Sequence, residues 1–250
     1  MQITRRLFVL AGLALAVPNF GFADDAASRA IVEKAIEVHG GEKVIAKFKA
    51  TSSKIKGSIY INGAPVSFTG EIDTQGAEQL KALISFTLDG QSISFVSVLN
   101  RGQGWLKINN DTVDTPAEQL ADMKESTYSG WVTSLVPLKD KAFVLAPFGE
   151  AEIGGRKAVG VNVTREGHRP INLFFDKESS RLVRTESRVR DETSGQEVNE
   201  ESTYSEYKPI DGIQHPTKIT VKRNDKPHAD VEVTELKLTE KLDDNVFGKP

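Results

Sequence analysis

The chain has 250 residues, of which 38% are hydrophobic and 27% are charged, so its composition is that of a globular rather than a disordered protein. It contains no cysteine, which excludes a disulfide framework, thiol chemistry and a lipid anchor built on cysteine. Its formal net charge of −3 argues against a nucleic-acid partner.

The first 23 residues have the pattern of a cleaved secretory signal. Arg5 and Arg6 form a short basic region, an apolar run extends from Leu7 to Val17, and small residues at Gly21 and Ala23 suit cleavage after Ala23. The run is too short for the roughly 20 residues that a membrane-spanning helix needs. The arginine pair fits export by the general secretory (Sec) or the twin-arginine (Tat) route. Cleavage would leave 30 basic and 35 acidic residues, a net charge of −5.

Residues 26–39 are predicted to form a helix. Ala27, Ile31 and Ala35 recur at a spacing of four residues, and Gly40-Gly41 would end the helix. His39 would lie in the last turn of this helix, where a positive charge interacts favourably with the helix dipole. This interpretation is preferred over a ligand-binding role for His39. A second short helix is expected over residues 44–48.

From residue 51 the apolar period changes to two, which indicates strands. In "KIKGSIYING" the residues Ile55 and Ile59 share one face, and Asn62-Gly63 predicts a hairpin turn. The alternation continues through residues 66–95, with Asp89-Gly90 as another hairpin turn. Adjacent antiparallel strands are therefore expected.

Residues 115–149 lack the sustained period-two alternation of the strands. Thr115 is predicted to cap a helix with Pro116 at its first position, and the helix would run through "AEQLADMKE". The following "YSGWVTSLVPL" is expected to be partly helical, and "KAFVLAPFG" is a short apolar run. We expect this segment to be an insertion that crosses or lids the sheet.

Strands then resume and continue to the end of the chain. Gly154-Gly155, residues 176–180 and Asp211-Gly212 are the expected turns, while Pro209 and Pro216 suit strand ends. The total is ten or eleven strands in one sheet, close to the size at which a twisted open sheet must curl, split or close. The fold class is therefore mainly β with α (α+β), in a single domain over residues 24–250.

Four segments together resemble a known family: "HGGEKVIAKFKA", "FFDKESSRLVR", "YSEYKPIDGIQHPTKI" and the closing "LDDNVF". In this order they are similar to the periplasmic lipoprotein-carrier superfamily with the LolA-like fold, in particular its outer-membrane lipoprotein-sorting proteins. The resemblance covers nearly all of the chain after the signal. It implies an unclosed half-barrel of about eleven antiparallel strands around helices, with an apolar cavity that shields acyl chains.

The resemblance implies a non-enzymatic periplasmic carrier for a lipid or a lipidated protein in outer-membrane trafficking, with a membrane-bound donor or acceptor. An apolar cavity suits this task, because burying an acyl chain is worth about 0.8 kcal/mol per methylene. The expected location is the periplasm, as a soluble protein without its own lipid anchor.

Nine apolar residues are candidates for the wall of this cavity. Each also suits a plain core position, and Trp131, in the expected lid, is the best single candidate for ligand contact. The candidates are Ile59, Phe68, Ile84, Phe86, Phe95, Trp105, Trp131, Leu173 and Phe175.

Catalytic and metal-binding patterns are weak. His39, His168, His215 and His228 have no metal-like spacing, so no metal site and no cofactor are expected. Adjacent acids such as Glu200-Glu201 would point to opposite faces of a strand, which does not suit shared acid-base work.

Two other functions remain open at this stage. The sheet can serve as a protein-interaction or assembly module whose concavity is filled and which carries no lipid. A hydrolase would need a titratable group with a shifted pKa in a pocket, and no residue cluster in the sequence indicates one.

Overall fold

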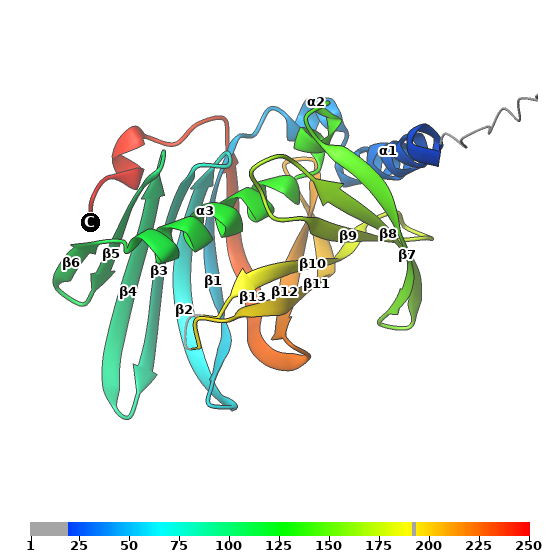
Figure 1. Ribbon diagram of the computed structural model, residues 1–250. Helices are drawn as coiled ribbons and strands as arrows, with labels where there is room; N and C mark the ends of the chain where they lie inside the picture. Colours follow the sequence, from blue (N-terminus) through cyan, green and yellow to red (C-terminus); the bar gives the residue numbers. More distant parts are fainter. Residues whose placement is uncertain (1–19, 192–193) are drawn as a thin grey trace, which may run out of the picture.

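The computed structural model describes residues 20–191 and 194–250 (Figure 1). The predicted signal falls mostly on residues 1–19, outside the described part of the chain. Within that part, the helices are α1 (Phe20–His39), α2 (Glu42–Ile45) and α3 (Ala117–Val132), with two 3₁₀ turns, η1 (Val136–Lys139) and η2 (Asp244–Phe247). No described helix is long and apolar enough to cross a bilayer.

The described residues form one antiparallel sheet of 13 strands in the order β6-β5-β4-β3-β2-β1-β13-β12-β11-β10-β9-β8-β7. Its first half comprises β1 (Ala50–Ile61), β2 (Ala64–Gln75), β3 (Gln79–Leu88), β4 (Gln91–Asn100), β5 (Gln103–Ile108) and β6 (Asp111–Asp114). Its second half comprises β7 (Val144–Ile153), β8 (Arg156–Thr164), β9 (Ile171–Asp176), β10 (Leu182–Arg190), β11 (Glu197–Ile210), β12 (Ile213–Arg223) and β13 (Lys226–Thr239).

The strand order explains how the helical insertion lies over the sheet. The edge strands β6 and β7 are consecutive in the sequence, so residues 115–143 must run from one edge of the sheet to the other. Figure 1 shows α3 crossing one face on this path, as the sequence predicts for an insertion that crosses the sheet. We call the face under α3 the inner face and the opposite one the outer face.

Side-chain alternation assigns residues to these faces. A Cβ atom added to Gly104 would lie 2.7 Å from a methyl carbon of Leu120 in α3, so Gly104 points inward. Its partner Leu99 points inward too, and so does Phe95 four residues before it on β4. The pairing register carries this assignment across the whole sheet.

The packed core fills half of the inner face. Helix α1, the C-terminal half of α3 and η1 cover strands β7 to β12 there. The core side chains include Val32 and Ile36 of α1, Val132 of α3, and Leu173 and Phe175 of β9, each no more than 3% exposed.

The mainly β fold class and the unclosed antiparallel sheet are confirmed, although the strand number is 13 rather than about eleven. The short polar β6 carries no apolar alternation, and β7 continues through Pro147 at an irregularity in its pairing. The predicted turns at Asn62-Gly63, Asp89-Gly90 and Asp211-Gly212 are confirmed. Helix α1 begins at Phe20, ahead of the predicted residue 26.

The predicted cap at Thr115 is wrong. The N-cap residue of α3 is Pro116, and no side chain caps the helix. The amide of Thr115 donates instead to the carbonyl of Gly104, 2.9 Å away, so Thr115 still belongs to the end of the sheet.

We expect Gly57→Ala to lower the free energy of unfolding by about 1–3 kcal/mol. A Cβ atom at Gly57 would lie 1.9 Å from the carbonyl oxygen of Asp230 on the neighbouring strand and 3.2 Å from the ring of Phe68. Urea denaturation measures the change. The matched control is Gly130→Ala in α3, where the new Cβ atom meets nothing within 4 Å and alanine favours the helix. Equal stability of Gly57→Ala and the wild type would contradict the close strand approach.

Candidate functional site

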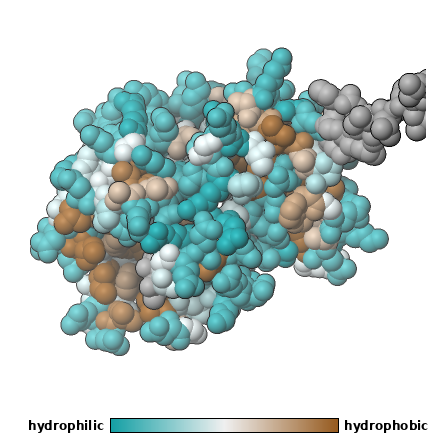
Figure 2. Space-filling view, viewed as in Figure 1, coloured by the Kyte–Doolittle hydropathy of each residue, from teal (hydrophilic) through white to brown (hydrophobic). Residues whose placement is uncertain are grey.

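The other half of the inner face is apolar and carries no helix of the packed core. This surface lies on the turn-side halves of β1 to β5 and on β12 and β13, and we call it the apolar face. At the lower left of Figure 2, hydrophobic residues line a hollow in this region. Most of its side chains are half-buried, while Phe68 is only 6% exposed and Ile108 is 52% exposed. Its members are Ile59, Val66, Phe68, Ile84, Phe86, Ile93, Phe95, Ile108, Val221 and Ala229.

Five of the nine sequence-predicted residues lie together on the apolar face. Phe68 pairs with Phe86, and Ile84 pairs with Phe95 on the next strand. Ile59 lies two strands from Ile84 on the same side of the sheet. Their role as ligand contacts stays a prediction, but the structure gathers them on one surface.

Trp105 lies on the opposite side of the sheet. It pairs with Val98, whereas Phe95 pairs with Ile108, three residues further along β5. An odd separation on a strand reverses the side-chain direction, so Trp105 faces outward. The chain end packs on this outer side, where Lys249 pairs with Asp114 at 2.9 Å.

The three remaining candidates belong to the filled half of the inner face. Leu173 is 0% exposed and Phe175 is 1% exposed, both within the core. Trp131 is half-buried against the same core, with its ring 6.2 Å from that of Phe143 and 6.1 Å from that of Tyr128. Trp131 therefore packs α3 against the core.

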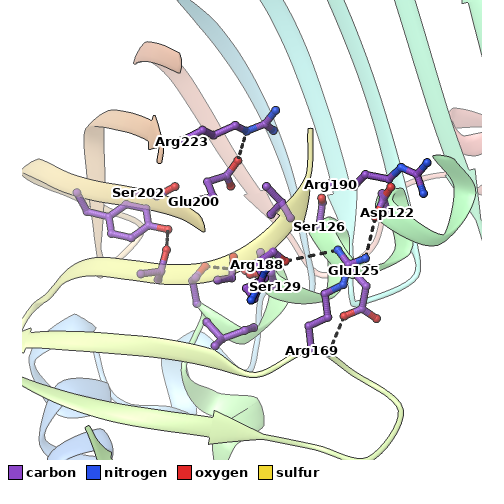
Figure 3. A pocket seen from close by; sticks show the side chains of 17 residues that line it. Asp122, Glu125, Ser126, Ser129, Arg169, Arg188, Arg190, Glu200, Ser202 and Arg223 are labelled. Atoms are coloured by element: carbon purple, nitrogen blue, oxygen red, sulfur yellow. Dashed lines mark hydrogen bonds and ion pairs between the residues drawn. The ribbon is translucent and has the colours of Figure 1, made fainter. Parts of the chain in front are cut away.

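A polar cavity of about 220 Å³ lies between α3 and strands β9 to β12 (Figure 3). We call it the polar cavity; none of the nine sequence-predicted residues lines it. It is lined by Asp122, Glu125, Ser126, Ser129, Gly130 and Thr133 of α3, and by Arg169, Ile171, Thr185, Ser187, Arg188, Val189, Arg190, Glu200, Ser202, Tyr204 and Arg223 of the sheet side.

Ion pairs and hydrogen bonds hold the walls of the polar cavity. Arg169 pairs with Asp122 at 3.1 Å, and the Arg169 amide donates to Glu125 at 2.9 Å, which ties α3 to the start of β9. Arg223 pairs with Glu200 at 2.9 Å across β11 and β12. The Thr185 and Tyr204 hydroxyl oxygens lie 3.0 Å apart, and burial raises the pKa of Tyr204, so this phenol stays neutral.

Sequence reasoning missed the polar cavity because its lining residues are as far apart in the sequence as Asp122 and Arg223. A weak signal was present: Thr185 and Ser187 alternate on β10, and Ser202 and Tyr204 alternate on β11. Such a pattern also describes a solvated strand face, and only the fold turns it inward.

A second cluster of buried titratable side chains, His39, Tyr207 and His215, lies near the C-terminal end of α1. The His39 ring lies edge-on to Tyr207, 5.5 Å between centroids, and its Nδ1 donates to the Ala35 carbonyl at 2.7 Å. Burial lowers the pKa of His39, so it is a neutral donor rather than the cation expected at the helix end. The pKa of His215 is lowered to about 4, mainly by burial and to a smaller extent by the nearby His39. Among the described residues, no three His, Asp or Glu side chains are placed to hold a metal.

These histidines make stability depend on pH. Between pH 6.5 and about 4 the unfolded chain binds a proton that His215 in the folded protein does not, and the lowered pKa of His39 adds a difference of the same sign below pH 6.5. Stability therefore rises with pH across this window, and we expect acidification from pH 7 to 4.5 to cost about 1–3 kcal/mol of unfolding free energy. Urea denaturation at both pH values measures the loss, and His215→Asn should reduce it. An undiminished loss in that variant would contradict the role of His215.

Solved structures of other proteins share this architecture. No model of a known protein family matches the chain, and no curated protein matches it. Among solved structures, a DUF1329 family protein from Desulfovibrio piger superposes with a TM-score of 0.57 at 15% identity, over 88% of this chain and 97% of that one. A LolA superfamily protein from Nitrosomonas europaea gives 0.55 at 14% identity, over 89% and 97%. The chain has the LolA-like fold.

A third solved structure has a similar fold. It is described as a candidate outer membrane lipoprotein-sorting protein domain from Vibrio parahaemolyticus, with a TM-score of 0.55 and 12% identity over 87% of this chain and 97% of that one. At such identities the LolA-like likeness describes the architecture alone.

Proposed function

We propose that the protein is a carrier that binds an acyl chain of a lipid or a lipidated protein on the apolar face. The observation that supports this most directly is the half-filled inner face. Helices pack on one half of it, whereas Phe86, Phe95 and their neighbours on the other half stay half-buried with no helix of the core over them. The lipoprotein-sorting description of a protein with the same fold agrees with such a ligand.

The energetics suit a carrier. Burying eight methylenes of an acyl chain would contribute about 6 kcal/mol at about 0.8 kcal/mol each, before the cost of association. No charged clamp is required for binding of this strength, and a modest net affinity permits release. The apolar residues of β1 to β5 provide contacts along several neighbouring strands.

The site of action that we propose is the periplasm. The support is the secretory pattern of residues 1–23, which includes Arg5, Arg6 and the apolar run that follows. In this proposal the carrier takes its cargo from a membrane-bound donor and passes it to an acceptor in outer-membrane trafficking. It acts as a binding protein and uses no cofactor.

The alternative of a protein-interaction module requires a filled concavity. The packed core covers strands β7 to β12, and the apolar face on β1 to β5 lies outside that core. This arrangement favours the carrier over the module.

A direct titration tests the proposal. The full chain is exported in a Gram-negative host, purified without detergent and titrated with a pyrene-labelled hexadecanoic acid. We expect saturable binding with one probe per protein and a micromolar Kd. Fluorescence that rises linearly without saturation would contradict an acyl-chain site.

A further inference from the structure

The apolar face and the polar cavity are continuous along the sheet. Ile59 pairs with Ala229, Ala229 pairs with Val221, and Val221 pairs with Ser202 in the cavity wall. Paired residues point to the same side, so this row crosses the inner face from apolar side chains to a hydroxyl in three strand steps, about 14 Å. The adjacent row of pairs ends at Tyr204.

The polar lining of the cavity carries as many hydroxyl side chains as charged ones, seven of each. The hydroxyls come from Ser126 and Ser129 on α3 and Thr133 at its end, and from Thr185, Ser187, Ser202 and Tyr204 on the facing strands. The cavity volume of about 220 Å³ far exceeds the roughly 10–15 Å³ that one water needs on the same measure, so it has room for a ligand group. A hydroxyl donates and accepts hydrogen bonds, so this wall can match a ligand with both kinds of group.

The arginines of the cavity are already paired with carboxylates. Their nearest partners lie at 3.1 Å for Arg169 and Asp122, 2.7 Å for Arg190 and Glu118, 2.9 Å for Arg223 and Glu200, and 3.3 Å for Arg188 and Glu197. An anion entering the cavity would compete with these carboxylates and meet their negative charge. An uncharged ligand group escapes that competition.

We propose that the polar cavity binds the polar head of the ligand whose acyl chain lies on the apolar face, and that this head is uncharged and carries several hydroxyl groups. Glycerol and sugar heads share this chemistry. The inference rests on the proposed carrier function and adds the chemical class of the cargo. It also explains why α3 presents serines to a sheet whose neighbouring surface is apolar.

Ligands with the same tail and different heads test the proposal. Octyl glucoside, 1-O-octylglycerol and octyl phosphate, each below its critical micelle concentration, compete with the pyrene-labelled acid on the exported protein. We expect the better of the two hydroxyl-bearing ligands to displace the probe at about tenfold lower concentration than octyl phosphate, as expected for two or three added hydrogen bonds. The order of glucoside and octylglycerol distinguishes a sugar head from a glycerol head.

A double variant locates the effect. Ser126→Leu with Ser129→Leu removes two hydroxyls and fills the cavity with residues that favour a helix, so the fold should survive. The preference for hydroxyl-bearing ligands should disappear in it and persist in the control Ala121→Leu, an exposed position of α3 outside the cavity lining.

The outcomes separate this inference from the carrier proposal. Equal displacement by all three ligands, tighter binding of octyl phosphate, or a preference that survives in the double variant would each overturn the head site while acyl binding stands. Absence of saturable probe binding would overturn the carrier proposal, and the head site with it.

Discussion

Replacing Phe175 with alanine should lower the free energy of unfolding by about 3–5 kcal/mol. Phe175 is 1% exposed and packs in the core that joins α1 and α3 to strands β7 to β12. Losing the ring leaves a cavity that the packed helices cannot fill by small movements. Chemical denaturation followed by circular dichroism measures the change.

The matched control for this variant is Phe148→Ala. Phe148 is 45% exposed on the outer side of the sheet, where the centroid of its ring lies 5.8 Å from that of Phe174 in a T-shaped arrangement. Its loss should cost less than about 1 kcal/mol. If Phe175→Ala instead kept its stability and lost binding of the acyl probe, Phe175 would line a ligand site, as the sequence alone suggested, and its place in a packed core would be wrong.

The variant Phe86→Asp should weaken binding of the acyl probe by about 10- to 100-fold. Phe86 lies between Phe68 and Ile93 on the apolar face, where a carboxylate would have to lose its water against the acyl chain. Because Phe86 is half-buried, part of the cost falls on the fold, so thermal unfolding is measured beside the titration.

The neighbouring Thr87 supplies a control on the same strand. Thr87 is exposed and points to the outer face, so Thr87→Asp adds the same charge at one residue's distance and should bind the probe like the wild type. Equal weakening in both variants would indicate a general effect of charge or of lost stability, and would remove the apolar face as the binding surface.

Local signals in the sequence identified much of the fold. The hairpins depend on residue pairs that tolerate a left-handed backbone, and Asn62 and Gly63 have φ values of 52° and 81°, while Asp211 and Gly212 have 49° and 83°. Period-two alternation identified the long strands for the same local reason. The pairing of β1 with β13 joins residues as far apart as Ala50 and Thr239, and no local signal in the sequence indicates it. The strand count indicated one sheet large enough to curl, and only the resemblance to a known fold indicated an unclosed half-barrel.

The candidate site was predictable in part. Alternation gathered Ile59, Phe68 and Phe86 on one face, because their spacing is a property of each strand. It failed to place Trp105, since the glycine-rich turn at residues 102–104 resets the phase between strands. The expected lid residue Trp131 is half-buried and packs against the core, because α3 rests on the sheet through its C-terminal half.

The polar cavity lay beyond sequence reasoning for a different reason. Its charged residues are ordinary strand and helix-surface residues taken singly, and each looks solvated in the sequence. Their convergence requires α3 to cross β9 to β12, which follows from the position of β6 and β7 at opposite edges of the sheet. Strand order is therefore what creates a polar pocket beside an apolar surface.

Native mass spectrometry of the exported protein, purified without detergent, tests the central claim that the apolar face holds an acyl chain. We expect a discrete added mass on the wild type that organic extraction recovers as a lipid, and that is absent from Phe86→Asp but present on Thr87→Asp. A bare wild-type mass that persists after incubation with envelope lipids would contradict it.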